Sequence, residues 1–239
     1  MALKSVSIDN KNYDISYEIV NPSCKKDIVF LHGWGSNKDI MKNAFSSYLK
    51  DFRHIYIDMP GFGKSANEYE LTTIEYSKII DELLKLLNST KDIIAGHSYG
   101  GKVATSLNPK NLVLLSTAGI LEEKSFEVKA KIAIAKFFNT LGLKNITKMF
   151  RSSDVNTMNE GMYSTFKNVV NEDFSQKFKN YKNNALIFWG EKDTATSLES
   201  GKKIASLIDS STFISYDGDH FFFVKNTKDI SERIENGIL

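Results

Sequence analysis

The stretch Ile93-Ile94-Ala95-Gly96-His97-Ser98-Tyr99-Gly100-Gly101 joins an apolar, β-branched run to the pentapeptide Gly-x-Ser-x-Gly. A helix-compatible stretch, residues 102–107, follows it. This order predicts a strand, a sharp turn and a helix, which is the setting that a nucleophile elbow requires. Gly96 and Gly100 would let the strand and helix backbones pass close together, while the strained turn lifts the Ser98 hydroxyl to the top of a sheet. Ser98 is therefore the candidate nucleophile.

The segments on both sides of this stretch alternate between strand and helix patterns. Two alternating runs, residues 3–9 and 13–20, predict an opening β-hairpin. Short continuous apolar runs, which suit strands buried on both faces, occupy residues 27–31, 53–58, 111–117, 185–189 and 212–216. Apolar residues recur at helical spacing in residues 40–52, 71–87 and 198–207, which predicts helices there, and a closing helix is expected to run to about residue 235. The alternation predicts an α/β fold with a mostly parallel sheet and helices on both faces.

Residues 119–184 interrupt the alternation. They contain no convincing strand pattern, and apolar residues recur at helical spacing around Ile132, Ala135, Phe138 and Leu141 and again around Met162, Phe166 and Val169. We therefore expect residues 1–118 and 185–239 to form one α/β core and residues 119–184 to form a helical insertion.

Composition excludes several classes of protein. The chain has 239 residues, of which 41% are hydrophobic, and its 31 basic and 29 acidic residues leave no strong basic field for nucleic acid. No apolar run approaches the roughly 18 residues that span a bilayer, and the N-terminus lacks the apolar region of a signal peptide. We expect a cytoplasmic protein, a monomer or homodimer.

No His, Cys and carboxylate set has metal-ligand spacing, so we expect neither metal nor cofactor.

A serine nucleophile needs a base, and a histidine base needs a carboxylate to orient it. His220 follows the last predicted strand, so it and Ser98 should lie at the carboxyl edge of the sheet, where ligand chemistry collects in open α/β folds. Asp193 follows the strand before the last one and is the preferred carboxylate, with Glu191, Glu122 and Glu123 as weaker rivals. The order Ser98, Asp193, His220 is the order typical of a Ser-Asp-His triad on such a sheet.

The negative charge that develops on an attacked carbonyl needs hydrogen-bond donors. The backbone N–H of Tyr99, directly after the nucleophile, is one candidate. The loop His32-Gly33-Trp34-Gly35 follows a central strand and offers a second, for which Trp34 is the preferred residue. Trp34 and Tyr99 are therefore the predicted oxyanion hole, and both should also contact substrate.

Five motifs together resemble the α/β-hydrolase superfamily over nearly the whole chain. They are Leu31-His32-Gly33-Trp34-Gly35, Asp58-Met59-Pro60-Gly61-Phe62-Gly63-Lys64-Ser65, Gly96-His97-Ser98-Tyr99-Gly100-Gly101, Trp189-Gly190-Glu191-Lys192-Asp193 and Gly218-Asp219-His220. The resemblance implies an eight-stranded sheet, a helical cap inserted after strand six, and a cleft between the cap and the sheet. It also implies that Trp34 and Tyr99 form the oxyanion hole.

The sequence favours a serine carboxylesterase that cleaves small or medium esters with an apolar portion through an acyl-enzyme. Aromatic and methionine side chains in the insertion, of which we select Phe137, Phe138 and Met162, should line the apolar part of the cleft. Two alternatives stay open: a ligand sensor that keeps the fold but turns over slowly, and a hydrolase of C–C bonds. The expected partner is a small ester-like molecule.

Overall fold

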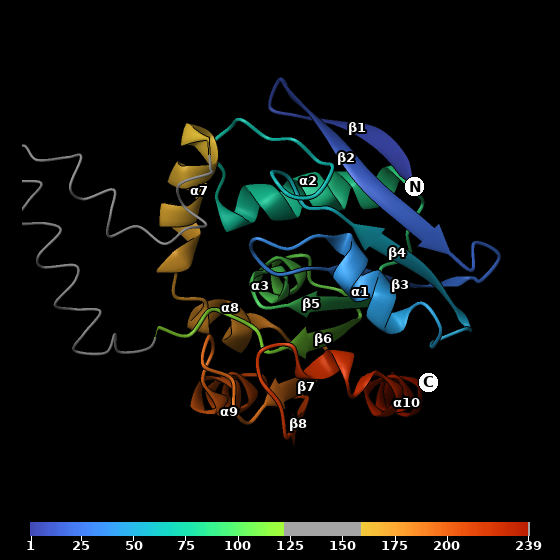
Figure 1. Ribbon diagram of the computed structural model, residues 1–239, viewed down its shortest axis with the longest axis vertical. Helices are drawn as coiled ribbons and strands as arrows, with labels where there is room; N and C mark the ends of the chain where they lie inside the picture. The colour runs from blue at the N-terminus through green and yellow to red at the C-terminus, as the bar shows by residue number, and fades with distance from the viewer. Residues whose placement is uncertain (122–158, 239) are drawn as a thin grey trace, which may run out of the picture.

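An eight-stranded sheet forms the centre of the molecule, for which a computed structural model describes residues 1–121 and 159–238 (Figure 1). The strands lie in the order β1-β2-β4-β3-β5-β6-β7-β8; the β1–β2 and β2–β4 pairs are antiparallel and all other pairs are parallel. Their bounds are β1 Ala2–Ile8, β2 Lys11–Val20, β3 Lys26–Leu31, β4 Phe52–Ile57, β5 Ile93–His97, β6 Asn111–Leu115, β7 Asn184–Gly190 and β8 Ser211–Tyr216. The predicted mostly parallel sheet is confirmed.

Helices cover both faces of this sheet. Their bounds are α1 Lys38–Phe45, α2 Thr73–Leu86, α3 Tyr99–Ser106, α7 Glu160–Val170, α8 Ser175–Asn180, α9 Leu198–Leu207 and α10 Thr227–Ile238, with a 3₁₀ turn η2 at Phe222–Val224. The buried residues of α2, α3 and α9 pack in one apolar cluster, and those of α1 and α10 pack in another. The sheet therefore separates two cores.

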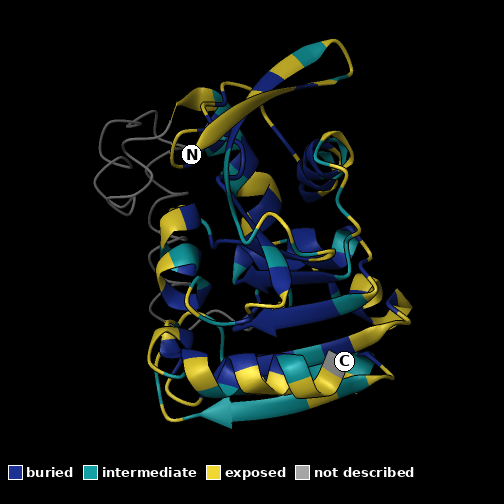
Figure 2. Cartoon of the chain, turned by 90° about the vertical axis from the view of Figure 1, so that its right-hand side faces the viewer, coloured by how far each residue is buried: buried dark blue, intermediate teal, exposed yellow. Residues whose placement is uncertain are grey.

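The continuous apolar runs of the central strands follow from this double burial. In β3, Val29 and Leu31 belong to one core, whereas Ile28 and Phe30 belong to the other. Successive side chains of a strand point to opposite faces, so a strand covered on both sides needs an apolar residue at every position. Figure 2 shows the central strands as almost wholly buried, in contrast to the exposed residues of the opening hairpin.

Two helix ends show how local chemistry sets the element bounds. Thr72 caps α2 through a reciprocal capping box with Glu75, which agrees with the predicted start of that helix. The prediction that the preceding helix extends to residue 52 is wrong, because α1 ends at Phe45. Leu49 adopts a left-handed backbone conformation, with a φ of 53°, and its carbonyl accepts the Phe52 N–H, so the chain turns directly into β4.

Part of the predicted insertion falls within the described residues. The helix expected around Met162, Phe166 and Val169 is present as α7, and α7 is fastened to the segment before α2: Thr165 Oγ1 accepts the Leu71 N–H at 2.8 Å, and Asn159 Nδ2 donates to the Asn67 carbonyl at 2.8 Å. The helix expected from residue 132 to 141 lies outside the described residues.

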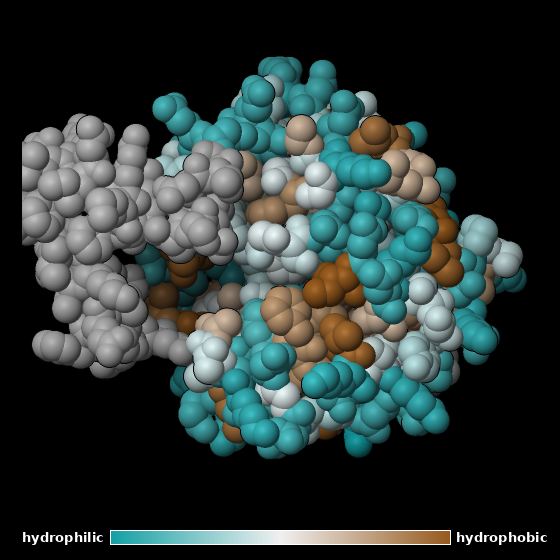
Figure 3. Space-filling model, in the orientation of Figure 1, coloured by the Kyte–Doolittle hydropathy of each residue, from teal (hydrophilic) through white to brown (hydrophobic). Residues whose placement is uncertain are grey.

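A further groove lies on the described surface, away from Ser98. A groove lined by Ile40, Ala44, Tyr48 and Val224 lies between α1 and the start of α10, and Figure 3 shows apolar surface over α1 and η2. The groove contains none of the predicted site residues. No helix within residues 1–121 and 159–238 has the length and apolar character needed to cross a membrane.

Candidate active site

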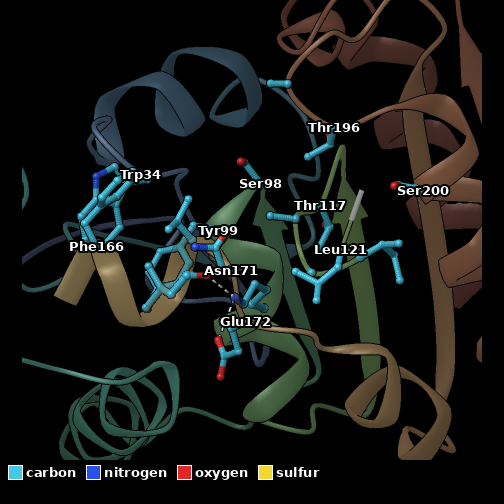
Figure 4. A pocket seen from close by; sticks show the side chains of 17 residues that line it. Trp34, Ser98, Tyr99, Thr117, Leu121, Phe166, Asn171, Glu172, Thr196 and Ser200 are labelled. Atoms are coloured by element: carbon cyan, nitrogen blue, oxygen red, sulfur yellow. Dashed lines mark hydrogen bonds and ion pairs between the residues drawn. The ribbon is translucent and has the colours of Figure 1, made fainter. Parts of the chain in front are cut away.

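Ser98 occupies a strained turn between β5 and α3. Its backbone has φ 51° and ψ −116°, a combination that side-chain-bearing residues rarely adopt. The turn closes because glycines stand where backbone segments meet: a Cβ on Gly96 would lie 2.4 Å from the Gly100 carbonyl oxygen, and one on Gly100 would lie 2.5 Å from the Leu31 carbonyl oxygen. The strand-turn-helix order predicted for this stretch is therefore confirmed, and the Ser98 side chain reaches a pocket above the sheet (Figure 4).

Asp193 and His220 come together at the same edge of the sheet. His220 Nδ1 lies 2.7 Å from Asp193 Oδ2, and the other carboxylate oxygen, Oδ1, accepts the backbone N–H groups of Ala195 and Thr196 at 2.8 and 3.0 Å. Thr196 Oγ1 also donates to Oδ2, at 2.9 Å. Burial raises the pKa of Asp193, but the hydrogen bonds from His220 and Thr196 outweigh it and lower that pKa to about 2. The carboxylate is thus ionised at neutral pH.

His97, the residue before Ser98, packs against His220. The His97 ring is buried beside the His220 ring, with the centroids 4.6 Å apart, and His97 Nε2 lies 3.0 Å from the His220 carbonyl oxygen. Within the described ranges Ser98 makes no side-chain hydrogen bond to His220. Catalytic hydrogen bonds are often longer in the absence of substrate and tighten in the complex. Burial lowers the pKa of His97 to about 3, so its ring is neutral.

His32 holds the loop that carries Trp34. Its Nδ1 lies 2.7 Å from the Gly33 carbonyl oxygen, and its Nε2 accepts the Met59 N–H at 3.0 Å, which ties this loop to the loop after β4. Burial lowers the pKa of His32 to about 4, and the neutral ring then carries its proton on Nδ1.

A buried ion pair reinforces the same junction. Asp58 Oδ1 accepts the Lys38 N–H at 2.8 Å, and Asp58 Oδ2 lies 2.9 Å from Lys38 Nζ. Both side chains are almost fully buried. Burial raises the pKa of Asp58, yet its hydrogen bonds to Lys38 and to the Lys64 N–H lower it overall. The start of α1 and the Gly33–Ser36 turn are therefore fixed to the end of β4.

A pocket of about 340 Å³ opens at Ser98. Figure 4 shows Trp34 and Phe166 on one side and Thr117 and Leu121 on the other, with Tyr99 toward the middle. Trp34 packs edge-on against Tyr99 and also contacts Phe166, with ring centroids 5.5 Å apart in each pair. Both predicted oxyanion residues therefore line the cavity that Ser98 enters.

The structure corrects one predicted contact residue. Met162 does not line this pocket: its side chain packs against Gly61, where an added Cβ would lie 2.1 Å from its sulfur, and Asn67 Nδ2 lies 3.5 Å from the same sulfur. Phe166 and Val169, one and two turns further along α7, face the cavity instead. Phe137 and Phe138 lie outside the described residues.

Sequence reasoning missed Lys102 and Glu172, which meet at the pocket. Lys102 lies one helical turn after Ser98, its side chain is 2% exposed, and its Nζ lies 2.7 Å from Glu172 Oε2. Lys102 could have been found from its spacing, because residues four apart at the start of a helix lie on the same side and Lys102 comes four residues after Ser98. Glu172 gave no comparable signal. In the described part of the chain, no group of three or more His, Cys, Asp or Glu side chains could hold a metal ion.

The strand order, the elbow at Ser98 and the Asp193–His220 pair at the carboxyl edge define an α/β-hydrolase fold. A family model described as the alpha/beta hydrolase fold matches residues 27–142. Two solved structures superpose at a TM-score of 0.76: an esterase from Exiguobacterium antarcticum, 20% identical and covering 98% of both chains, and the enol-lactonase from Burkholderia xenovorans LB400, 18% identical with the same coverage. At such identities the likeness concerns the fold alone. The family model and these two structures show that the chain has the α/β-hydrolase fold.

A curated relative is similar over part of the chain. The pimeloyl-[acyl-carrier protein] methyl ester esterase of Wigglesworthia glossinidia brevipalpis is 30% identical over 135 residues, which cover 47% of this chain and 51% of that protein. The chain thus spans about half the length of this relative.

Proposed function

We propose that the protein is a serine hydrolase that cleaves carboxylic esters. The observation that carries this proposal is the 2.7 Å contact between His220 Nδ1 and Asp193 Oδ2, at the sheet edge where Ser98 is held at a φ of 51°. An ionised Asp193 accepts a hydrogen bond from the N–H at Nδ1 of His220, so the neutral ring carries its proton there and Nε2 is unprotonated. That nitrogen is then the base for the Ser98 hydroxyl.

The reaction would proceed in two halves. Ser98 Oγ attacks the ester carbonyl while His220 takes its proton, and His220 then gives that proton to the leaving alcohol. Water, activated by the same nitrogen, next releases the acid from the acyl-enzyme. Asp193 remains ionised throughout and stabilises the imidazolium that forms in each half.

The oxyanion would be stabilised by the backbone N–H groups of Tyr99 and Trp34. Tyr99 is the first residue of α3, so its N–H has no acceptor within that helix and lies at the positive end of the helix dipole. The Trp34 N–H comes from the loop that His32 and the Lys38–Asp58 pair hold in place. These preorganised donors would act where charge develops in the transition state.

We further propose that the ester joins a small alcohol to an acyl chain of medium length. The pocket of about 340 Å³ has apolar walls from Phe166, Val169 and Leu121, which suit an acyl chain of medium length better than a long lipid. The similarity to the methyl ester esterase of Wigglesworthia glossinidia brevipalpis supports a small alcohol.

Labelling with a fluorophosphonate, together with turnover of p-nitrophenyl acetate, butyrate and octanoate, tests this function. Wild-type protein should label and release p-nitrophenol, and Ser98→Ala should do neither. Ser106→Ala, in the same α3 helix, is the matched control and should retain both. A folded wild-type protein that neither labels nor turns over would refute the proposal. Stabilisation by ligands without turnover would favour the sensor, and turnover of a vinylogous diketone but of no ester would favour the C–C bond hydrolase.

A further inference from the structure

The pocket ends in an ion pair that the proposed ester hydrolysis does not use. In Figure 4 Ser98 and Glu172 lie at opposite ends of the cavity, with Tyr99 between them. Glu172 pairs with Lys102 at 2.7 Å, and both residues line the cavity. The walls between the two ends carry apolar side chains, among them Phe166, Val169 and Leu121. A substrate that fills this space therefore needs an apolar stem and meets polar groups at its far end.

The Lys102 ammonium is held by two acceptors, which leaves its third N–H group for a ligand. Its Nζ donates to the Val169 carbonyl at 2.8 Å and pairs with Glu172, so two of its three N–H groups have acceptors within the described residues. The ammonium also lies 5.2 Å from the ring centroid of Phe174. Since Val169 is near the C-terminal end of α7, the negative end of that helix dipole adds to the stabilisation of the charge.

Glu172 offers an acceptor at the same place. Its Oε2 forms the ion pair with Lys102 and accepts a hydrogen bond from the Thr73 hydroxyl at 2.5 Å. Its Oε1 has no hydrogen-bond partner among the described residues. The Glu172 side chain is 28% exposed, so ligand can reach it. The end of the pocket thus presents a donor and an acceptor side by side, with their charges balanced.

We propose that this Lys102–Glu172 pair selects substrates whose apolar stem ends in a neutral group that both donates and accepts hydrogen bonds, namely a primary amide or a hydroxyl. This proposal rests on the proposed ester hydrolysis and names the substrate class for it. A terminal carboxylate or ammonium would be attracted by one member of the pair and repelled by the other, so it would lose its hydration without a net electrostatic gain. A plain alkyl end would strip water from the pair without replacing its hydrogen bonds. Lys102 and Glu172 are thus specificity-determining residues.

Matched p-nitrophenyl esters test the selection on the acyl side. Monoesters of adipamic, adipic and heptanoic acid have similar lengths but end in an amide, a carboxylate and an alkyl group, and homologues with four to eight carbons allow for the depth of the pocket. A second set, the acetates of 6-hydroxyhexanamide, 6-hydroxyhexanoate and heptanol, tests the alcohol side. In one of the two sets, we expect kcat/KM for the amide-ended ester to exceed that of the carboxylate-ended and alkyl-ended esters by about tenfold. A hydrogen bond to a charged group is strong enough to give this difference.

The double variant Lys102→Met/Glu172→Gln removes both charges while avoiding an unpaired buried ion. Its preference for the amide end over the alkyl end should fall to about onefold, as measured by the ratio of kcat/KM values. The control, Lys91→Met/Asp81→Asn, removes a half-buried ion pair whose lysine lies before β5, at the other end of that strand from Ser98, and should keep the preference. An unchanged ratio in the Lys102 double variant, with lower thermal stability only, would show that the pair merely joins α7 to α3 and would overturn the proposal.

Binding to the Ser98→Ala variant separates this proposal from the hydrolase proposal. Calorimetric titration of that variant with the same intact esters needs no turnover. Tighter binding of the amide-ended ester, lost in the triple variant with Lys102→Met and Glu172→Gln, would support the selection even if the wild-type protein cleaved nothing. Equal binding of all three ends in both sets to the Ser98→Ala variant, together with fluorophosphonate labelling of the wild-type protein, would refute the selection and leave the hydrolase proposal intact.

Discussion

Replacement of Asp193 by asparagine should abolish most of the activity while leaving a folded protein. The asparagine oxygen can still accept the N–H groups of Ala195 and Thr196, which now bond to Oδ1. Its NH₂ group would then face His220 Nδ1 and would favour the tautomer with the proton on Nε2. A proton on Nε2 blocks proton transfer from Ser98, so kcat should fall by about 10⁴-fold, as expected when a triad histidine is held in the wrong tautomer.

The same change should alter the response of stability to acid. The pKa of Asp193 is lowered from 3.8 to about 2 in the folded protein, a difference of about 1.8, and each pKa unit corresponds to about 1.4 kcal/mol. Because the folded-state pKa is the lower one, the ionised carboxylate contributes roughly 2 to 3 kcal/mol to the free energy of unfolding above pH 3.8. This contribution is lost as the pH falls from about 4 to about 2, and the asparagine variant should lack that part of the acid sensitivity.

Two assays check this prediction. Steady-state hydrolysis of p-nitrophenyl butyrate at pH 7.5 gives kcat, and urea unfolding between pH 6 and pH 2 gives the free energy of unfolding. Asp217→Asn is the matched control, because Asp217 is exposed, pairs with Lys192 and lies three residues from His220. It should change kcat by less than about twofold. An Asp193→Asn variant that keeps wild-type kcat, or an Asp217→Asn variant that loses as much, would refute the assignment of Asp193.

Three further predictions concern the framework around the site. Burial lowers the pKa of His32 to about 4 and that of His97 to about 3, below the ordinary 6.5, so the unfolded chain binds more protons in mildly acidic solution. The free energy of unfolding should therefore fall by about 1.4 kcal/mol per pH unit for each histidine between pH 6 and pH 4, as measured by urea unfolding. Lys38→Met should destabilise the protein by about 3 kcal/mol in the same assay, because it leaves Asp58 as a buried charge without a partner. Gly96→Ala should cost about 3 kcal/mol in thermal unfolding, because its Cβ would meet backbone that cannot move aside.

Matched variants make these outcomes decisive. Lys192→Met removes an exposed ion pair and should change stability by less than about 0.5 kcal/mol, in contrast to Lys38→Met. Gly35→Ala adds a Cβ with no atom within 4 Å, so it bears only the cost of a φ of 72° and should destabilise by about 1 kcal/mol. If His97→Asn leaves the pH dependence of the free energy of unfolding unchanged, burial of His97 is not its cause. Equal destabilisation by Lys38→Met and Lys192→Met, or by Gly96→Ala and Gly35→Ala, would contradict the reasons given for Lys38 and Gly96.

The sequence by itself determined the sheet and most of its helices. Continuous apolar runs such as residues 27–31 encode strands covered on both faces, and Thr72 with Glu75 encodes the start of α2. The Gly-x-Ser-x-Gly turn also followed from local spacing, because only glycine tolerates the contacts at Gly96 and Gly100. Chain order alone placed Asp193 and His220 after neighbouring strands, since the carboxyl ends of parallel strands share one edge.

Only the tertiary structure decided what surrounds Ser98. Periodicity identified α7 as a helix but not which of its sides faces the cavity, and Met162 turned out to pack against Gly61 while Phe166 and Val169 line the pocket. Lys102 and the Val169 carbonyl are 67 residues apart in sequence, and nothing near either residue indicates that they meet. Strand and helix patterns arise from neighbours a few residues apart, whereas a pocket is built from side chains that meet only after distant elements pack, so the local sequence carries no signal for their contact.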